Sequence, residues 1–180
     1  MEKILYTGVN HDSPNYIAWL EVVRDKKIPM VIIDRPQTIK LGDNCRLEIL
    51  YPLESFLNKE VENLNNTSIV ARLVYGNTSF SFTGDAEREE EKEILESGVD
   101  LSADVLKIGH HGSDTATSED FLKAVKPEIA VIEVGKDNQF GHPSLRTIKK
   151  LERAGAKVFR TDEAGTIKIV SDGARVEILR

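Results

Sequence analysis

The stretch ADVLKIGHHGSDTATSEDFLKAVKPEIAVIEVG, residues 103–135, decides the fold class of this chain. Its apolar runs at 103–109 and 128–135 are typical of buried strands, and the segment 117–125 between them is typical of a helix. Alternation of strand, helix and strand indicates a layered α/β fold. We therefore expect a sheet whose strands end in loops at a common edge.

The rest of the chain extends this pattern in both directions. Toward the C-terminus we expect a helix at 142–155 and short strands at 157–161, 166–170 and 175–179. Toward the N-terminus we expect a helix at 85–98, hairpins at 68–84 and 38–52, a strand at 29–34, a helix at 13–27 and a strand at 3–9. Hairpins followed by strand–helix alternation predict an α/β fold with a mixed sheet, and residues 1–180 form one unit.

Composition limits the possible functions. With 40% hydrophobic and 30% charged residues and a net charge of -6, the chain is expected to be a soluble globular domain without broad, non-specific nucleic-acid binding. A small site for one phosphate is compatible with this charge. Cys45 is the single cysteine, so any metal must be held by His, Asp or Asn. No apolar stretch approaches the roughly 20 residues that span a bilayer, and no leader pattern opens the sequence.

Polar residues that could carry chemistry follow the expected strands. Asp85 begins an acidic helix, where it is either the N-cap or a carboxylate ligand that points out of the sheet edge. His110 and His111 are either part of a Gly-rich turn or contain a metal ligand, because neutral imidazole is a common ligand. Neighbouring residues leave a strand on opposite sides, so at most one of the two histidines easily points into a given site.

Two further polar segments have similar alternatives. Asn138, His142 and Ser144 lie either at an ordinary helix start or beside backbone N–H groups that could bind a phosphate oxygen. Asn65, Asn66 and Ser68 open the central hairpin, either as a plain polar turn or as part of the same site. These loops could together support attack by a metal-activated water on a phosphoryl or acyl centre. The remaining histidine, His11, is expected at the surface, so the ligands are too few for a complete two-metal site.

Four segments in order carry a family resemblance: NNTSIVARLVYGNTSFSFTGDAE, residues 103–135, NQFGHP and GAKVFRTDEAGTIKIVSDG. They resemble the metallo-β-lactamase-like domain of the DNA-uptake competence protein family ComEC. The combination of Gly-Asp, His-His-Gly-Ser and Asn-x-x-Gly-His-Pro motifs makes the resemblance specific, and it covers essentially the whole chain. It implies an αββα sandwich with flanking helices and a two-metal site between its sheets.

The resemblance also implies roles for individual residues. Asp85 would bridge two metals, zinc or manganese, and either His110 or His111 would bind one of them. His142 would border the pocket, and we expect His142 and Asn138 to act in catalysis. Where other members of the superfamily have a further metal histidine, this chain has Asn65 and Asn66. We expect Asn66 and Ser113 to contact the substrate.

One motif of the superfamily, His-x-His-x-Asp-His, is absent from the sequence. The chain therefore resembles a C-terminal half, a single partial domain over residues 1–180. The implied parent is a bacterial membrane protein of DNA uptake and competence, with this domain outside the cytoplasmic membrane. The parent activity would be metal-dependent hydrolysis of DNA phosphodiesters, and this chain alone would be inactive or weakly active.

A half-domain is expected to need partners. Without its N-terminal half, the sandwich would leave an apolar sheet face uncovered, so we expect a homo-oligomer that makes no direct membrane contact. The partners would be the missing half and a DNA or other phosphodiester substrate. The alternative is a non-enzymatic α/β binding or assembly module, in which Asp85 and the histidines are only cap and turn residues.

Overall fold

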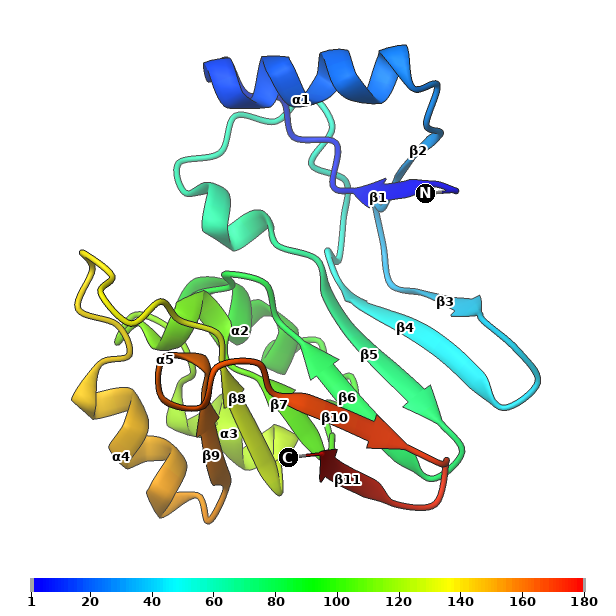
Figure 1. Ribbon diagram of the computed structural model, residues 1–180. Helices are drawn as coiled ribbons and strands as arrows, with labels where there is room; N and C mark the ends of the chain where they lie inside the picture. Colours follow the sequence, from blue (N-terminus) through cyan, green and yellow to red (C-terminus); the bar gives the residue numbers. More distant parts are fainter. Residues whose placement is uncertain (1, 180) are drawn as a thin grey trace.

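A seven-stranded mixed sheet forms the centre of the computed structural model, which describes residues 2–179 (Figure 1). Its strands lie side by side in chain order from β3 to β9, so strands that follow one another in the chain are also neighbours in the sheet. The sheet consists of β3 (Gln37–Lys40), β4 (Cys45–Tyr51), β5 (Val70–Tyr75), β6 (Thr78–Phe82), β7 (Val105–Lys107), β8 (Ile129–Ile132) and β9 (Lys157–Arg160). The first four pair antiparallel and β6 to β9 pair parallel, which confirms the expected mixed sheet.

Two small pairs of strands lie outside this sheet. β1 (Ile4–Tyr6) and β2 (Met30–Ile32) pair parallel, and β10 (Lys168–Ser171) and β11 (Val176–Leu179) form an antiparallel hairpin. The helices are α1 (Pro14–Asp25), α2 (Arg88–Glu96), α3 (Glu119–Val125), α4 (Leu145–Arg153) and α5 (Thr161–Ala164), with 3-10 turns η1 (Leu64–Thr67) and η2 (Gly109–Gly112). The sequence predicted four of these helices. It missed the three shortest helical segments, α5, η1 and η2, because one turn shows no periodicity.

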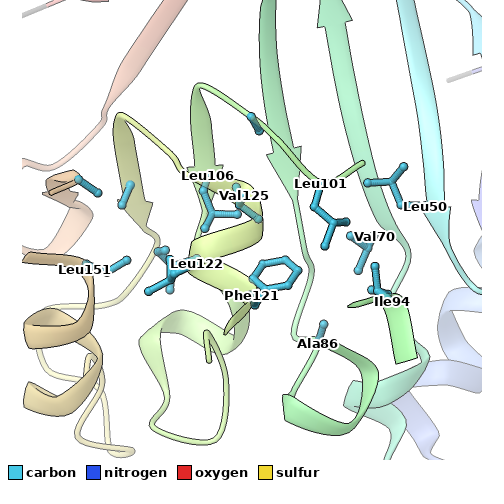
Figure 2. Packing of buried hydrophobic residues seen from close by; sticks show 14 of the residues in the cluster. Leu50, Val70, Ala86, Ile94, Leu101, Leu106, Phe121, Leu122, Val125 and Leu151 are labelled. Carbon is cyan, nitrogen blue, oxygen red and sulfur yellow. The ribbon is translucent and has the colours of Figure 1, made fainter. Parts of the chain in front are cut away.

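One face of the sheet is covered by α2, α3 and α4. Alternate strand residues such as Val70, Leu106 and Ala130 point to this face, because side chains in a strand alternate between its two sides. They pack against helix residues that include Phe121 and Leu151 (Figure 2). This cluster forms the main core, and it holds in place the loops at the ends of β6, β7 and β8.

The opposite face of the sheet is partly covered within the chain. The β10–β11 hairpin packs on Val105, Ile129 and Val131. Leu5 of β1 and Ile33, next to β2, join Ile49 and Ala71 in a second cluster. The uncovered apolar face that motivated the expected homo-oligomer is therefore smaller than we assumed, because segments at both ends of the chain fold back over it. The oligomeric state stays a prediction.

The helices are too short for a membrane span. Among residues 2–179, none of them combines the length and the apolar character that crossing a bilayer requires. The longest, α1, has 12 residues.

Candidate metal centre

The candidate site lies where the parallel strands β6, β7 and β8 end. Phe82 of β6 is in register with Lys107 of β7, which is in register with Val131 of β8. The chain therefore leaves all three strands at the same edge of the sheet. This register brings Asp85, the two adjacent histidines and His142 together, as the sequence led us to expect.

Asp85 does not cap a helix. α2 begins at Arg88 with Glu87 in the N-cap position, so the predicted helix start at residue 85 was wrong. The backbone N–H of Asp85 donates to Ser68 Oγ at 3.0 Å. Gly84 precedes it with φ +54°, and a Cβ there would come within 2.8 Å of the same Ser68 oxygen. This tight turn directs the Asp85 carboxylate out of the sheet edge, with 39% of the side chain exposed.

His111 is the histidine that faces Asp85. Its Nδ1 donates to the Glu133 carbonyl oxygen at 2.7 Å, and its Nε2 lies 3.5 Å from Asp85 Oδ1. Two donors that share one tetrahedral zinc, each about 2.1 Å from it, are about 3.4 Å apart. The pair thus has the spacing of two ligands of one metal. The Glu133 contact fixes the imidazole in the way that outer contacts usually orient metal-binding histidines.

His110 lies on the other side of the turn. Both histidines adopt left-handed backbone conformations, with φ of 45° and 53°, so their rings diverge. His110 Nδ1 lies 3.0 Å from Glu87 Oε1 but is not aligned for a hydrogen bond. Its ring meets that of His142 edge-on, with centroids 5.6 Å apart. The structure therefore separates the two histidines that sequence reasoning could not distinguish.

Lys107, which sequence reasoning missed, places a positive charge in the site. Its Nζ donates to the Gly84 carbonyl oxygen at 2.8 Å and lies 3.9 Å from Asp85 Oδ1. Burial lowers the pKa of Lys107, and the nearby carboxylates of Asp85 and Glu133 oppose this shift. A lysine at the end of an otherwise apolar strand was the signal that could have identified it, because Lys is rarely buried without a partner.

Glu87 is the second residue that sequence reasoning missed. Although it occupies the N-cap position, its side chain makes no capping hydrogen bond. It accepts a hydrogen bond from Asn65 Nδ2 at 2.9 Å and lies beside His110. Asn66 makes the side-chain contact at the helix start instead: its Oδ1 accepts the Glu87 backbone N–H at 3.0 Å. The two asparagines thus connect η1 to α2, and Asn66, a predicted substrate contact, holds the helix start. Glu87 was hidden in an acidic run whose expected role was only to favour the helix N-terminus.

Asn138 holds the loop that carries His142. Its Oδ1 accepts the backbone N–H of His142 at 3.0 Å, and its Nδ2 donates to the His142 carbonyl oxygen at 2.7 Å. Burial and the neighbouring His110 and His111 lower the pKa of His142. The structure thus places His142 beside the turn that carries His110 and His111, and it gives Asn138 a positioning contact with the backbone of His142.

The remaining sequence candidates lie at the margin of the site or away from it. Ser113 is buried and shares a hydrogen bond with the Thr115 hydroxyl at 2.9 Å. Ser144 caps α4 through the Thr147 backbone N–H. His11 is exposed and accepts the backbone N–H of Ser13 just before α1, which confirms its expected surface position.

The protein groups at the site suit a metal but are few. Asp85 and His111 offer one carboxylate oxygen and one imidazole nitrogen, which suit zinc and manganese. Within the described range 2–179, no three His, Cys, Asp or Glu side chains form a group that could hold a metal ion. The residues present therefore fit part of a metal centre.

Comparison with known proteins gives a consistent result. The chain is 33% identical over 149 residues to the ComE operon protein 3 of Bacillus subtilis, a match that covers 83% of the chain and 19% of that protein. It is 35% identical to the competence protein ComA of Neisseria gonorrhoeae, over 70% of the chain and 18% of that protein. It is 34% identical to recombination protein 2 of Haemophilus influenzae, over 99% of the chain and 23% of that protein. The chain thus spans about a fifth of the length of these relatives.

A solved structure supports the fold. A crystal structure described as a metal-dependent hydrolase from Parabacteroides distasonis matches 89% of this chain and 76% of its own, with a TM-score of 0.50 and 14% identity. No family model matches the chain. The ordered Gly-Asp, His-His-Gly-Ser and Asn-x-x-Gly-His-Pro motifs lie at one sheet edge of this fold. With the similarity to the competence proteins, they identify the chain as a metallo-β-lactamase-like domain of the ComEC type.

Proposed function

We propose that this chain is part of a metal-dependent hydrolase that cuts DNA phosphodiester bonds during DNA uptake. The observation that carries the proposal is the Asp85–His111 pair, whose donor atoms lie 3.5 Å apart. The names of the competence relatives support DNA uptake as the setting. In the longer protein, the domain would lie outside the cytoplasmic membrane of a bacterium.

The proposal includes ligands from outside the chain. A catalytic zinc usually has three protein ligands, and a two-metal site needs more. Asp85 and His111 supply two, so an N-terminal half-domain, which would pair with this partial domain, would supply the others. By itself the chain would then bind a metal weakly and hydrolyse DNA slowly or not at all.

The chain's own residues have distinct tasks in this proposal. A metal held by Asp85 and His111 would supply Lewis acidity and an activated water for attack on a phosphoryl centre. Lys107 holds the Gly84 carbonyl and so fixes the turn that presents Asp85. Its charge also favours the approach of an anionic phosphate. His142, positioned by Asn138, borders this region as a contact for the substrate or its leaving oxygen.

Metal binding and hydrolysis together test the proposal. Calorimetric titration of the chain with Zn²⁺ and with Mn²⁺ is expected to show a site that is lost in Asp85→Ala and His111→Ala. Cleavage of a labelled DNA strand should require one of these metals and disappear in the same variants, in the chain or in a longer protein that contains it. Binding that persists in both variants would refute the proposed site.

A non-enzymatic scaffold is the second candidate. The observation that favours it is that Asn66, Asn138 and Ser113 already form hydrogen bonds within the protein. In that case, replacing Asp85 and His111 would change stability only, and neither metal would shift the melting temperature.

A further inference from the structure

α4 concentrates positive charge on a protein whose net charge is -6. Its nine residues, LRTIKKLER, contain four cations and one acid. Arg146, Lys150 and Arg153 follow one another at spacings of four and three residues, so they share one side of the helix. Arg146 and Arg153 expose 83% and 68% of their side chains. Lys150 is half buried, and its Nζ donates to the carbonyl oxygens of Ala116 and Thr117. The exposed part of this basic stripe is therefore formed by Arg146 and Arg153.

This stripe continues into a groove between α3 and α4. The groove has a volume of about 430 Å³ and an apolar floor that includes Leu122 and Ala154. Its other lining residues are Lys123, Lys126, Lys150, Arg153 and a single acid, Glu119. Cations around an apolar floor suit a ligand that is both anionic and partly apolar, and a nucleotide unit has both properties.

An exposed aromatic ring lies at the other end of the stripe. Phe140 exposes 81% of its surface, although aromatic residues are usually buried. Its ring stacks on that of His142, with centroids 5.8 Å apart and 19° between the planes. The Ser144 backbone N–H, just before α4, donates to the Gly112 carbonyl oxygen at 2.9 Å. The ring, the turn η2 that carries His110 and His111, and the start of the stripe are thus directly connected.

We propose that Phe140, the basic stripe of α4 and the α3–α4 groove form a binding track for a single nucleic-acid strand. A base would stack on Phe140, and successive phosphates would contact Arg146, Arg153 and Lys126. Sequence-independent single-strand binding combines the same two features, aromatic rings and a basic groove. The inference rests on the proposed function, because the track would lead a strand to the site where hydrolysis is proposed.

Neighbouring acids do not prevent this binding. Arg146 lies 3.8 Å from Asp114, and Arg153 lies 3.1 Å from Glu119. All four side chains are half exposed or more. Exposed ion pairs contribute little stability, so a phosphate can replace the carboxylate at small cost. The net charge of -6 hides this local excess of cations, because many of the acids lie outside the track. Four of them are in residues 87–91.

Charge reversal tests the phosphate contacts. Binding of a fluorescent oligothymidylate of about twelve nucleotides is measured by anisotropy at several salt concentrations. The variant Lys126→Glu/Arg146→Glu/Arg153→Glu should bind at least about tenfold more weakly, and its slope of log affinity against log salt should fall by about two, or about 0.7 for each lost contact. The matched control Lys3→Glu/Lys26→Glu/Lys40→Glu changes the net charge equally, at exposed positions just before β1, just after α1 and on β3.

An aromatic substitution tests the stacking contact. Phe140→Ala should weaken binding several-fold with an unchanged salt slope, whereas Trp19→Ala on α1 should have no effect. Equal losses in the two charge variants would overturn the track, and so would binding that Phe140→Ala leaves intact. The titrations are done without metal, so a failure of metal binding or of cleavage would refute the proposed function without affecting this result.

Discussion

Nε2 of His111 lies 3.5 Å from Oδ1 of Asp85, while Nδ1 of the same ring donates to a carbonyl oxygen on the next strand's loop, that of Glu133. Because Nδ1 is used in this second contact, Nε2 is the ring nitrogen left to bind a metal beside the carboxylate. In the proposed metal centre, this pair would supply two of the ligands. The relationship also distinguishes His111 from its neighbour.

The first prediction concerns the two adjacent histidines. His111→Ala should abolish the rise in melting temperature that Zn²⁺ or Mn²⁺ produces, because it removes one of two donors. His110→Ala should retain most of that rise, since its ring faces Glu87 and His142 instead. Thermal unfolding with and without metal checks this. The reverse pattern would assign the metal to His110.

Replacing Lys107 should change metal affinity and DNA cleavage in opposite directions. Lys107→Met removes a cation 3.9 Å from Asp85, so metal affinity should rise, by about tenfold at most. Cleavage of DNA should nevertheless fall, because the phosphate loses an attracting charge. Lys107→Arg keeps the charge and serves as the control. Calorimetry and a cleavage assay measure the two effects, and a drop in both would contradict the prediction.

The buried carboxyl group of Glu90 should make the protein less stable as the pH rises. This side chain is 1% exposed, and neither carboxylate oxygen has a hydrogen-bond partner among the described residues. Burial raises its pKa to about 9, the nearby backbone N–H of Ser68, which is outside hydrogen-bond geometry, opposes the shift, and the carboxylates of Glu93 and Glu91 add to it. The folded state therefore keeps the proton up to about pH 9, whereas the unfolded state loses it near its ordinary pKa.

The sign follows from the protons bound in each state. Between the two pKa values the unfolded chain binds fewer protons, so Glu90 makes the protein less stable as the pH rises through that window. Glu90→Gln should be nearly neutral at pH 4 and stabilising by about 2–3 kcal/mol at pH 7. Urea unfolding across this range checks the result, with Glu96→Gln on the same helix as an exposed control. A stability difference that does not vary with pH would contradict the prediction.

Replacing Gly112 by alanine should lower stability by more than backbone strain alone. Its φ is +82°, and an added Cβ would lie 2.7 Å from Cβ of Pro143. Gly98 has a similar φ of +72° with nothing within 4 Å. Gly98→Ala should therefore cost about 1 kcal/mol from strain alone, and Gly112→Ala about 2–3 kcal/mol because the His142 loop must also move. Urea unfolding gives both values, and equal costs would show that the loop adapts freely.

Local signals in the sequence determined most of the secondary structure. Alternating apolar residues predicted the strands of both hairpins, and the helix expected at 13–27 is α1 in the structure. The strand–helix alternation after residue 98 predicted the parallel part of the sheet, because parallel strands need a crossover. From this it followed that loops with Asp85, the two histidines and His142 would share one edge.

Only the tertiary structure decided which side chains face one another. His111 is oriented by the carbonyl of a residue 22 positions later, and Asp85 does not act as a cap because α2 begins only at Arg88, with the Glu87 backbone N–H held by Asn66. The roles of Lys107 and of the stripe on α4 likewise depend on contacts with residues that are distant in sequence. The physical reason is one of range: propensity and periodicity act within a few residues, whereas ring orientation, burial and local charge depend on contacts between separate elements.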